Sequence, residues 1–296
     1  FDEDGKRYIE GLSGLWCASL GFSESRLVDA ATRQMKALPF YHNFAHKAVE
    51  PAIELADYLV NKVSVPMSKV FFTNSGSEAN DTQVKLARYY NNLRGRPEKK
   101  KIIARRGAYH GITLAASSLT GMQYAHNAFD VPLPGFLHVS CPHYYHHARE
   151  NETEAEFASR LVIELEQLIM SEGPDTVAAF IAEPVLGAGG VIPAPAGYFE
   201  AIQLLLKKHD ILFIADEVIT GFHRTGGMLG SDTCGLRPDL ISMAKALSAG
   251  YLPIGAVMIS DEIHEVLVEG SRRFGMFGHG FTYSGHPVPA AVALET

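Results

Sequence analysis

The chain has 296 residues, of which 47% are hydrophobic and 20% are charged, an ordinary balance for a globular protein. Its net charge of −7 and its isoelectric point near 6.0 argue against a surface that binds nucleic acid. No hydrophobic run approaches the length of a membrane-spanning helix, about 18 residues, so we expect no membrane contact. Cys17, Cys141 and Cys234 are odd in number and far apart, which favours a reducing, cytoplasmic location over a disulfide framework.

Short hydrophobic segments alternate with amphipathic ones along the whole chain. We predict strands at residues 69–73, 101–105, 135–139, 177–182, 211–215, 239–243 and 255–260. The expected helices cover residues 24–38, 50–63, 77–94, 154–170, 197–208 and 262–268, with a capping box of Thr153 and Glu156 at the fourth. The alternation predicts an α/β fold with a mainly parallel sheet and helices on both faces. Ligands bind such sheets beyond the carboxyl ends of the strands, where Thr73, Asp216 and Lys245 fall.

Lys245 follows the predicted strand 239–243, and Asp216 directly follows the predicted strand 211–215. A lysine amine and a carboxylate at the ends of neighbouring strands suit pyridoxal phosphate chemistry. The amine forms a Schiff base with the aldehyde, and the acid pairs with the pyridinium nitrogen. A solvated loop lysine is the common alternative for such a position. Three further segments favour the catalytic interpretation.

The first segment is Ser75, Gly76 and Ser77, between the predicted strand 69–73 and the following helix. Ser75 is a good helix N-cap, and the free amides at a helix start favour an anion that Gly76 allows to come close. An ordinary capped helix is the alternative interpretation. The segment is not a Walker P-loop, because no Gly-Lys-Ser/Thr follows at the required spacing.

Two glycine-rich segments complete the set. Tyr109 and His110 are flanked by glycines, so the tyrosine ring can lie flat against a planar cofactor, and a turn with an exposed tyrosine is the alternative. Residues 278–287, GHGFTYSGHP, offer the hydroxyl groups of Thr282 and Ser284 to a phosphate. An irregular loop explains this second segment equally well.

In this order the segments resemble the class III pyridoxal-phosphate aminotransferases, or omega-transaminases, from the first residue to the last. The resemblance rests on FDEDG at 1–5, TNSGSEA at 73–79, YHG at 109–111, EP at 183–184, ADEV at 215–218, GFHRTG at 221–226, PDL at 238–240, AK at 244–245, GYLP at 250–253 and FTYSGH at 281–286. Within the class, LWC at 15–17, LPFY at 38–41 and GFTYSGHP at 280–287 look most like the pyruvate-dependent amine transaminases. The resemblance implies a fold-type-I transferase that uses pyridoxal 5′-phosphate.

The resemblance also implies a role for each residue around the cofactor ring. Lys245 would carry the cofactor and move the substrate proton, and Asp216 would keep the pyridine nitrogen protonated. Val218 and Tyr109 would pack on opposite faces of the ring, with His110 beside them.

Further residues would hold the phosphate and shape the substrate pocket. The resemblance implies that the phosphate is bound by Thr282 from the neighbouring subunit and by Ser75, Gly76 and Ser77. Trp16 would form a wall of the substrate pocket. Glu183 would lie near the cofactor, where the family commonly keeps a carboxylate that pairs with a mobile arginine.

The chain departs from the family pattern at two positions and in length. Ala246 replaces a more usual glycine and His223 interrupts the pattern Gly-Phe-Gly-Arg-Thr-Gly, which affects the expected substrate range and not the chemistry. We expect residues 1–42 to contribute to a small domain and the substrate pocket, and residues 43–296 to form the large cofactor-binding domain. We expect the family's C-terminal small domain to be absent, and with it the arginine that grips a substrate carboxylate.

The implied reaction moves an amino group from an amine or ω-amino acid to a keto acid such as pyruvate. It would be a ping-pong reaction through pyridoxamine phosphate, in a homodimer with shared active sites. The alternatives are another class III activity, namely an aminomutase, racemase or dialkylglycine decarboxylase, and a non-catalytic fragment. The sequence names neither the amine nor the keto acid.

A metal site is a separate hypothesis for the segment 141–147. Cys141, His143, His146 and His147 lie within seven residues, but their spacing matches no common zinc pattern. We therefore expect a polar loop rich in aromatic residues, and no metal.

Overall fold

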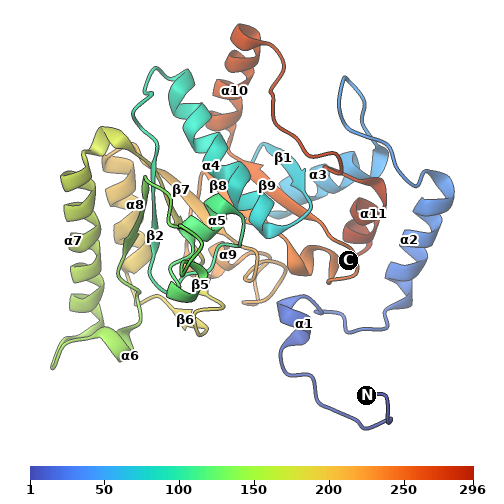
Figure 1. Cartoon of the computed structure of the whole chain (residues 1–296), viewed down its shortest axis with the longest axis horizontal. Helices are drawn as coiled ribbons and strands as arrows, with labels where there is room; N and C mark the ends of the chain where they lie inside the picture. The colour runs from blue at the N-terminus through green and yellow to red at the C-terminus, as the bar shows by residue number, and fades with distance from the viewer.

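The computed structural model covers residues 1–296 and centres on one seven-stranded sheet (Figure 1). The strands are β1 (Lys69–Thr73), β2 (Lys101–Arg105), β3 (Phe136–Val139), β4 (Val177–Ala182), β7 (Leu212–Asp216), β8 (Leu240–Met243) and β9 (Gly255–Ile259). Their order is β1-β9-β8-β7-β4-β2-β3, and β9 alone runs antiparallel to its two neighbours. The predicted mainly parallel sheet is confirmed, and each predicted strand is present to within about one residue at each end. A separate two-stranded ribbon joins β5 (Val185–Leu186) to β6 (Ile192–Pro193).

Helices cover both faces of the sheet, as predicted (Figure 1). One face packs against α4 (Gly76–Leu93), α5 (Leu114–Leu119) and α10 (Asp261–Phe274) through a cluster of 18 buried hydrophobic residues. The opposite face packs against α3 (Glu50–Lys62), α7 (Glu154–Glu172), α8 (Tyr198–Lys208) and α11 (Pro287–Glu295) through a cluster of 35. Strand β4 is buried along its whole length because both of its faces are covered.

Helix boundaries agree where a local signal exists. The capping box at α7 is confirmed, because Thr153 Oγ1 accepts from Glu156 N and Glu156 Oε2 accepts from Thr153 N at 2.8 Å. Helix α10 continues to Phe274, where we predicted an end at residue 268. Gly270 lies inside this helix because a Cβ there would lie 2.5 Å from Leu93 of α4, so the glycine allows the two helices to pack closely.

Short helices were not predicted, because contacts from distant residues stabilise them. Asp81 accepts hydrogen bonds from Thr113 Oγ1 and Ala116 N at the start of α5. Glu217 accepts from the amides of Gly230 and Ser231 at the start of α9 (Gly230–Cys234). These partners lie between about 13 and 35 positions apart in sequence, beyond the reach of local patterns.

The N-terminal segment extends away from the sheet at the lower right of Figure 1 and contains the single turn α1 (Ser13–Trp16). Helix α2 (Ser25–Ala37) follows and packs against α11. Tyr251 Oη accepts a hydrogen bond of 2.6 Å from Glu24 N, which ties the segment to the turn after β8. No helix in the chain is both long and hydrophobic enough to cross a membrane.

Candidate active site

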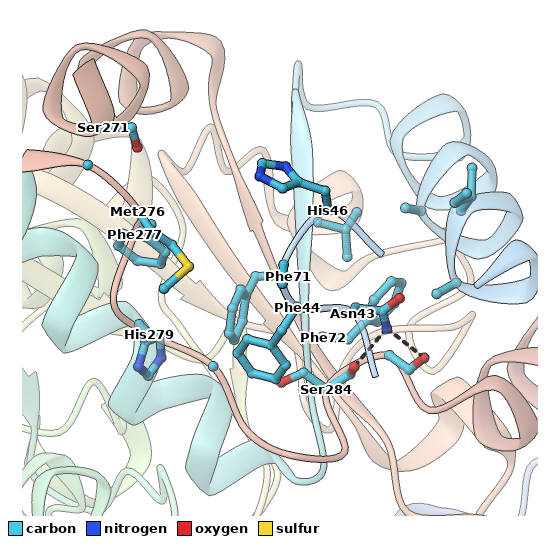
Figure 2. A pocket seen from close by; sticks show the side chains of 18 residues that line it. Asn43, Phe44, His46, Phe71, Phe72, Ser271, Met276, Phe277, His279 and Ser284 are labelled. Atoms are coloured by element: carbon cyan, nitrogen blue, oxygen red, sulfur yellow. Dashed lines mark hydrogen bonds between the residues drawn. The ribbon is translucent and has the colours of Figure 1, made fainter. Parts of the chain in front are cut away.

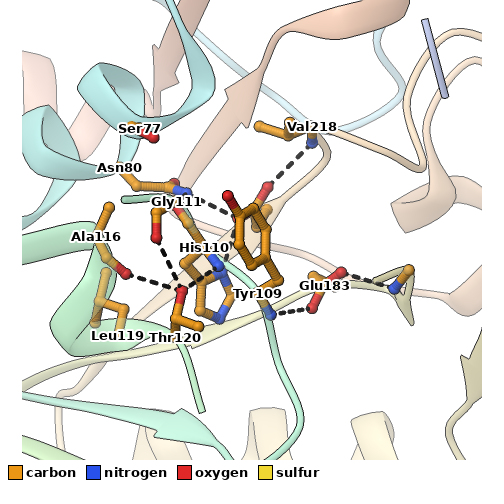
Figure 3. A network of polar contacts seen from close by, with 12 residues as sticks. Ser77, Asn80, Tyr109, His110, Gly111, Ala116, Leu119, Thr120, Glu183 and Val218 are labelled. Atoms are coloured by element: carbon orange, nitrogen blue, oxygen red, sulfur yellow. Dashed lines mark hydrogen bonds and ion pairs between the residues drawn. The ribbon is translucent and has the colours of Figure 1, made fainter. Parts of the chain in front are cut away.

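A cavity of about 120 Å³ lies beyond the carboxyl ends of β7 and β8, beside the first turn of α4. Segments that are distant in sequence form its walls, and Figure 3 shows the polar contacts that join several of them. The lining residues are Gly76, Ser77, Asn80, Tyr109, His110, Gly111, Glu183, Asp216, Val218, Ile219, Ala244 and Lys245. One lysine and two carboxylates therefore share a cavity with the N-terminus of a helix.

Lys245 follows β8 after one residue and begins the 3-10 turn Lys245–Ser248. Its φ of +47° lies in the left-handed region, which costs a residue with a side chain about 1–2 kcal/mol. Gly250 N donates to Lys245 O at 3.3 Å and closes the turn. Such strained residues occur often at functional sites, where the surrounding fold holds them in place.

Asp216 ends β7 and is 2% exposed. Its Oδ2 accepts hydrogen bonds from His110 Nδ1 at 2.7 Å and Asn80 Nδ2 at 2.8 Å, and its Oδ1 accepts from Val218 N at 3.1 Å (Figure 3). Burial alone raises the pKa of this carboxyl, but the hydrogen bonds from His110 and Asn80 outweigh burial and hold the pKa below its usual value. The cavity thus holds a carboxylate that stays ionised although it is buried.

Glu183 fixes the loop that carries Tyr109. Its Oε1 accepts from Tyr109 N at 3.1 Å, and its Oε2 accepts from Gly187 N at 2.8 Å. Burial raises the pKa of Glu183, and the negative charge of Asp216 adds to this rise, against the opposing effects of His110, the Gly187 amide and Arg105. Arg105 Nη2 donates to the Glu183 carbonyl oxygen at 2.6 Å, so the backbone of Glu183 is fixed as well as its side chain.

The first turn of α4 forms one edge of the cavity. Ser75 Oγ accepts from Glu78 N at 3.2 Å and caps the helix. A Cβ at Gly76 would lie 2.9 Å from Val218, and a Cβ at Gly111 would lie 2.4 Å from Ser77 Oγ. Since Ser77 Oγ accepts from Ile112 N at 3.1 Å, its own proton is left to donate to a ligand.

Three residues predicted for the site lie outside this cavity. Ser75 serves as the cap of α4, Trp16 lies in the N-terminal segment, and Thr282 is exposed in the segment that leads to α11. Of the two unusual positions, Ala246 is buried next to Lys245 without lining the cavity, and His223 is exposed.

Four lining residues were not predicted as site residues: Asn80, Gly111, Ile219 and Ala244. Asn80 follows Gly76 and Ser77 by four and three positions on one helix, so helical spacing places it on the same face. That spacing is the sequence signal that could have identified it. Ile219 and Ala244 are hydrophobic neighbours of Val218 and Lys245, and no distinctive residue type marks them.

A second, larger cavity lies elsewhere and has a different character (Figure 2). This groove, of about 730 Å³, is bordered by residues 43–46, β1 and residues 271–285. Asn43 Nδ2 donates to the carbonyl oxygens of Ser284 and Gly285 at 2.9 and 3.0 Å, which fixes the segment before α11. His279 stacks on Phe71 with ring centroids 5.1 Å apart. The groove is mostly hydrophobic, and we assign the chemistry to the smaller cavity because Lys245 and Asp216 lie there.

The side chains of the segment with one cysteine and three histidines are not arranged around a common metal position. Cys141 is buried with Ala108, Leu186 and Ile192, whereas His146 and His147 lie on the short helix α6 (Tyr144–His147). Neighbouring imidazole rings contact each other edge to face, with the centroids of His143 and His146 4.4 Å apart. No group of three or more His, Cys, Asp or Glu side chains in the chain is arranged to hold a metal ion.

The geometry of the cavity agrees with the result of a comparison with known protein families. The model of the family Aminotransferase class-III matches residues 1–296. The chain belongs to the class III aminotransferase family. The predicted family and the predicted fold, that of the fold-type-I pyridoxal-phosphate transferases, are confirmed.

Several characterised proteins are similar to this class III aminotransferase chain. It is 59% identical over 296 residues to gamma-aminobutyrate transaminase 1, mitochondrial, of Oryza sativa subsp. japonica and to vanillin aminotransferase of Capsicum frutescens. It spans 57% and 64% of the length of these two proteins. A crystal structure of the omega transaminase from Pseudomonas jessenii in complex with PMP is similar with a TM-score of 0.99 and 57% identity, covering 100% of this chain and 65% of that chain.

The predicted cytoplasmic location is wrong. Similar curated proteins are mitochondrial or chloroplastic gamma-aminobutyrate transaminases, from Oryza sativa and Solanum lycopersicum. The three cysteines are indeed free, but free cysteines distinguish reducing from oxidising surroundings and do not identify one compartment.

Proposed function

We propose that this chain contributes the cofactor-binding part of a transaminase. The enzyme moves an amino group from an amine or ω-amino acid to a keto acid such as pyruvate. The observation that carries the proposal is the cavity in which Lys245, Asp216 and the N-terminus of α4 meet. Names of similar proteins support it, since they include gamma-aminobutyrate transaminases and a vanillin aminotransferase.

The cofactor of the family is pyridoxal 5′-phosphate, and the residues present fit it. Asp216 accepts three hydrogen bonds, and a carboxylate offers about four acceptor positions, so one position remains for the pyridinium N–H. The amides at the start of α4 and the Ser77 hydroxyl suit a phosphate. Gly76 and Gly111 keep the slot open, because a Cβ at either position would collide with a neighbour.

When bound, pyridoxal phosphate supplies an aldehyde that takes up amino groups and a ring that accepts electrons from the substrate carbon. Lys245 Nζ would hold the cofactor covalently and then carry the proton removed from the substrate carbon. Asp216 would keep the ring nitrogen protonated, with His110 and Asn80 keeping Asp216 ionised. Tyr109 and Val218 would pack on the two ring faces, and Glu183 would hold the Tyr109 loop.

We also infer that the complete site requires two copies of the chain. Thr282 is exposed and lies outside the cavity that contains Lys245, which fits a role in a neighbouring subunit's site. The hydrophobic groove that borders this segment would then lie in the interface of a homodimer. We also propose that Ser75 contributes to the phosphate site by capping α4. Residues 1–42, with Trp16, would form a wall of the substrate pocket.

A half-reaction tests the proposed activity. Purified protein reconstituted with pyridoxal phosphate should show a visible absorption band that an amine donor bleaches and pyruvate restores. A panel of amines and ω-amino acids then identifies the donor class by rate. Carbon dioxide release from a 2,2-dialkylglycine, or conversion of one enantiomer or positional isomer of an amino acid to another without a keto acid, would instead support the alternative class III activities. A stable band that no amine bleaches would support a non-catalytic fragment.

A further inference from the structure

Arg105, the last residue of β2, is a fully buried cation without an acidic partner. It is 0% exposed and takes part in none of the ion pairs of the chain. Its Nη2 donates to the Glu183 carbonyl oxygen, whereas Nε and Nη1 have no hydrogen-bond partner. The guanidinium lies over the ring of Phe199, 5.6 Å from the ring centroid. Burial of a charge is costly unless an opposite charge lies near it, so the surroundings of Arg105 should contain one.

The neutral groups around the guanidinium do not supply that charge. Three titratable side chains besides Glu183 feel the charge of Arg105, namely Tyr198, Cys141 and Cys234. Burial raises the pKa of all three, and the charge of Arg105 opposes that rise. A phenol and two thiols with raised pKa values stay neutral near pH 7. Glu183 is therefore the member of this group that can carry the opposite charge.

The charge state of Glu183 depends on opposing neighbours. Burial favours the protonated acid, and so does the negative charge of Asp216 in the same cavity. His110, the Gly187 amide and Arg105 favour the carboxylate. A guanidinium keeps its charge at every pH at which the protein is folded, whereas an imidazole does not. Arg105 is thus the permanent cation that favours an ionised Glu183 beside an ionised Asp216.

The ionised state of Glu183 matters because both of its carboxylate oxygens accept hydrogen bonds. Oε1 accepts from Tyr109 N at 3.1 Å, and Oε2 accepts from Gly187 N at 2.8 Å. Protonation turns one of these oxygens into a hydroxyl, which accepts more weakly than a carboxylate oxygen. Tyr109 and Glu183 both line the cavity (Figure 3). A protonated Glu183 would therefore hold the Tyr109 segment less firmly.

We propose that Arg105 is a positioning residue of the cofactor site: its buried charge keeps Glu183 ionised, and Glu183 holds Tyr109 in place against the cofactor ring. This inference rests on the proposed function, because it concerns the same cavity. Arg105 does not line that cavity, so its effect on a ligand passes through Glu183. Ligand affinity should fall as the pH drops through the pKa of Glu183, and loss of Arg105 should move this fall to higher pH.

The experiment measures binding of a cofactor analogue that does not react. Equilibrium dialysis of the full chain, freed of cofactor, gives the affinity for 4′-deoxypyridoxine 5′-phosphate between pH 5 and pH 8. This analogue lacks the aldehyde and forms no Schiff base with Lys245. The variants are Arg105→Met, Arg105→Lys, Glu183→Gln, and Arg105→Met combined with Glu183→Gln. Arg106→Met is the matched control, because Arg106 is the exposed neighbour and the change in net charge is the same.

We expect the wild type, Arg106→Met and Arg105→Lys to lose affinity in acid with a common midpoint. In Arg105→Met this midpoint should rise by about one pH unit, the lower end for removal of a nearby opposite charge. Glu183→Gln should lack this acid limb, since its side chain does not ionise. In that background Arg105→Met should leave the pH dependence unchanged, because two residues that act through one contact are not additive. An unmoved midpoint in Arg105→Met, or a midpoint that moves in the Glu183→Gln background, would overturn the inference.

A purely structural role gives a different pattern. If Arg105 only packs between the strand ends, Arg105→Met weakens the analogue by one factor at every pH and in both backgrounds, which also overturns the inference. Circular dichroism checks folding. If Arg105→Met does not fold, the inference stands only when Glu183→Gln loses the acid limb and Arg105→Lys keeps it, and failure of either contradicts it. Bleaching of the cofactor band by an amine tests the proposed activity separately, and it can succeed or fail whichever way the analogue binds.

Discussion

The cavity around Asp216 and the surface formed by residues 274–283 differ in how completely their side chains are buried and bonded within the chain. In the cavity, Asp216 is 2% exposed and its carboxylate accepts three hydrogen bonds. On the surface, Phe274, Met276 and Tyr283 are 62%, 80% and 57% exposed. Large hydrophobic side chains rarely gather at a surface without a partner. In the homodimer proposed above, one chain prepares the chemistry, and the second subunit completes the edge of the site.

The largest expected effect comes from the cavity. Lys245→Ala should lower the turnover rate by about 10⁴-fold, because general acid–base catalysis alone contributes about 10²–10⁴-fold. Part of the cofactor should stay bound through the phosphate contacts. Product formation and bound cofactor are measured together, with Lys207→Ala of the exposed end of α8 as the control. Near-normal transamination by Lys245→Ala would remove the lysine from its proposed role.

Asp216→Asn should keep the fold and lower kcat/KM by about 100-fold, or about 2.7 kcal/mol. An amide does not stabilise the pyridinium charge as a carboxylate does, so electron withdrawal by the ring weakens. Circular dichroism checks the fold, and steady-state kinetics measure the loss. If the variant kept more than about a tenth of the activity, the loss would be under about 1.4 kcal/mol and the role of Asp216 at the ring nitrogen would be withdrawn.

His110→Phe should destabilise the apo protein by about 1.5 kcal/mol, the lower end for a hydrogen bond to a charged group. The effect depends on pH. The pKa of Asp216 is lowered in the folded state, so its contribution to stability is present above the unfolded value, about 3.9, and is lost as the pH falls through the folded pKa.

Burial raises the pKa of Asp216 and the His110 hydrogen bond lowers it, so removing that hydrogen bond raises the pKa. The acid limb of the unfolding free energy should therefore move to higher pH in His110→Phe. Denaturant titrations between pH 3 and pH 7 measure the unfolding free energy of the variant and of the wild type. An acid limb identical to that of the wild type would show that His110 does not control Asp216.

The exposed surface gives a smaller effect, which appears in cofactor binding. Thr282→Ala should weaken pyridoxal phosphate binding about fivefold, equivalent to about 1 kcal/mol for one hydrogen bond. Dilution of the wild type to monomer should also release cofactor. Equilibrium dialysis measures the cofactor affinity, and sedimentation measures the fraction of dimer at each protein concentration. A monomer that binds the cofactor as tightly as a dimer would show that the site is complete in one chain and that the two regions do not cooperate.

The smallest effect provides a baseline far from both regions. Thr153→Ala removes the cap of α7 and should cost about 1 kcal/mol of unfolding free energy or less. Catalysis and cofactor affinity should not change. A change in either would mean that general destabilisation contributes to the effects expected for the cavity variants.

The sequence predicted the strands of the sheet because each is a short hydrophobic run followed by a turn residue. It also predicted the motifs at the carboxyl ends of β1, β7 and β8. It did not predict that β9 runs antiparallel, because a strand's pattern does not encode the direction of its neighbours. The short helices α5 and α9 depend on Asp81 and Glu217, which reach them from distant parts of the chain.

Within the site, residue types with unusual chemistry were predicted and ordinary ones were not. Lys245 and Asp216 stand out because an amine and an acid at strand ends are chemically distinctive. The partners of Asp216 do not stand out in this way. Asn80 reaches it through the helical geometry of α4, and the hydrogen bond from His110 depends on the packing of a loop against β7. These contacts are tertiary, and they keep Asp216 in the ionised state that the proposed chemistry requires.

The most direct test of the account locates the cofactor on the chain. The holoenzyme is reduced with borohydride, digested, and analysed by mass spectrometry for a lysine that carries a pyridoxyl group. The account predicts one modified residue, Lys245, with labelling lost in Lys245→Ala. Labelling of a different lysine, or equal labelling of several exposed lysines with Lys245 unmodified, would contradict it.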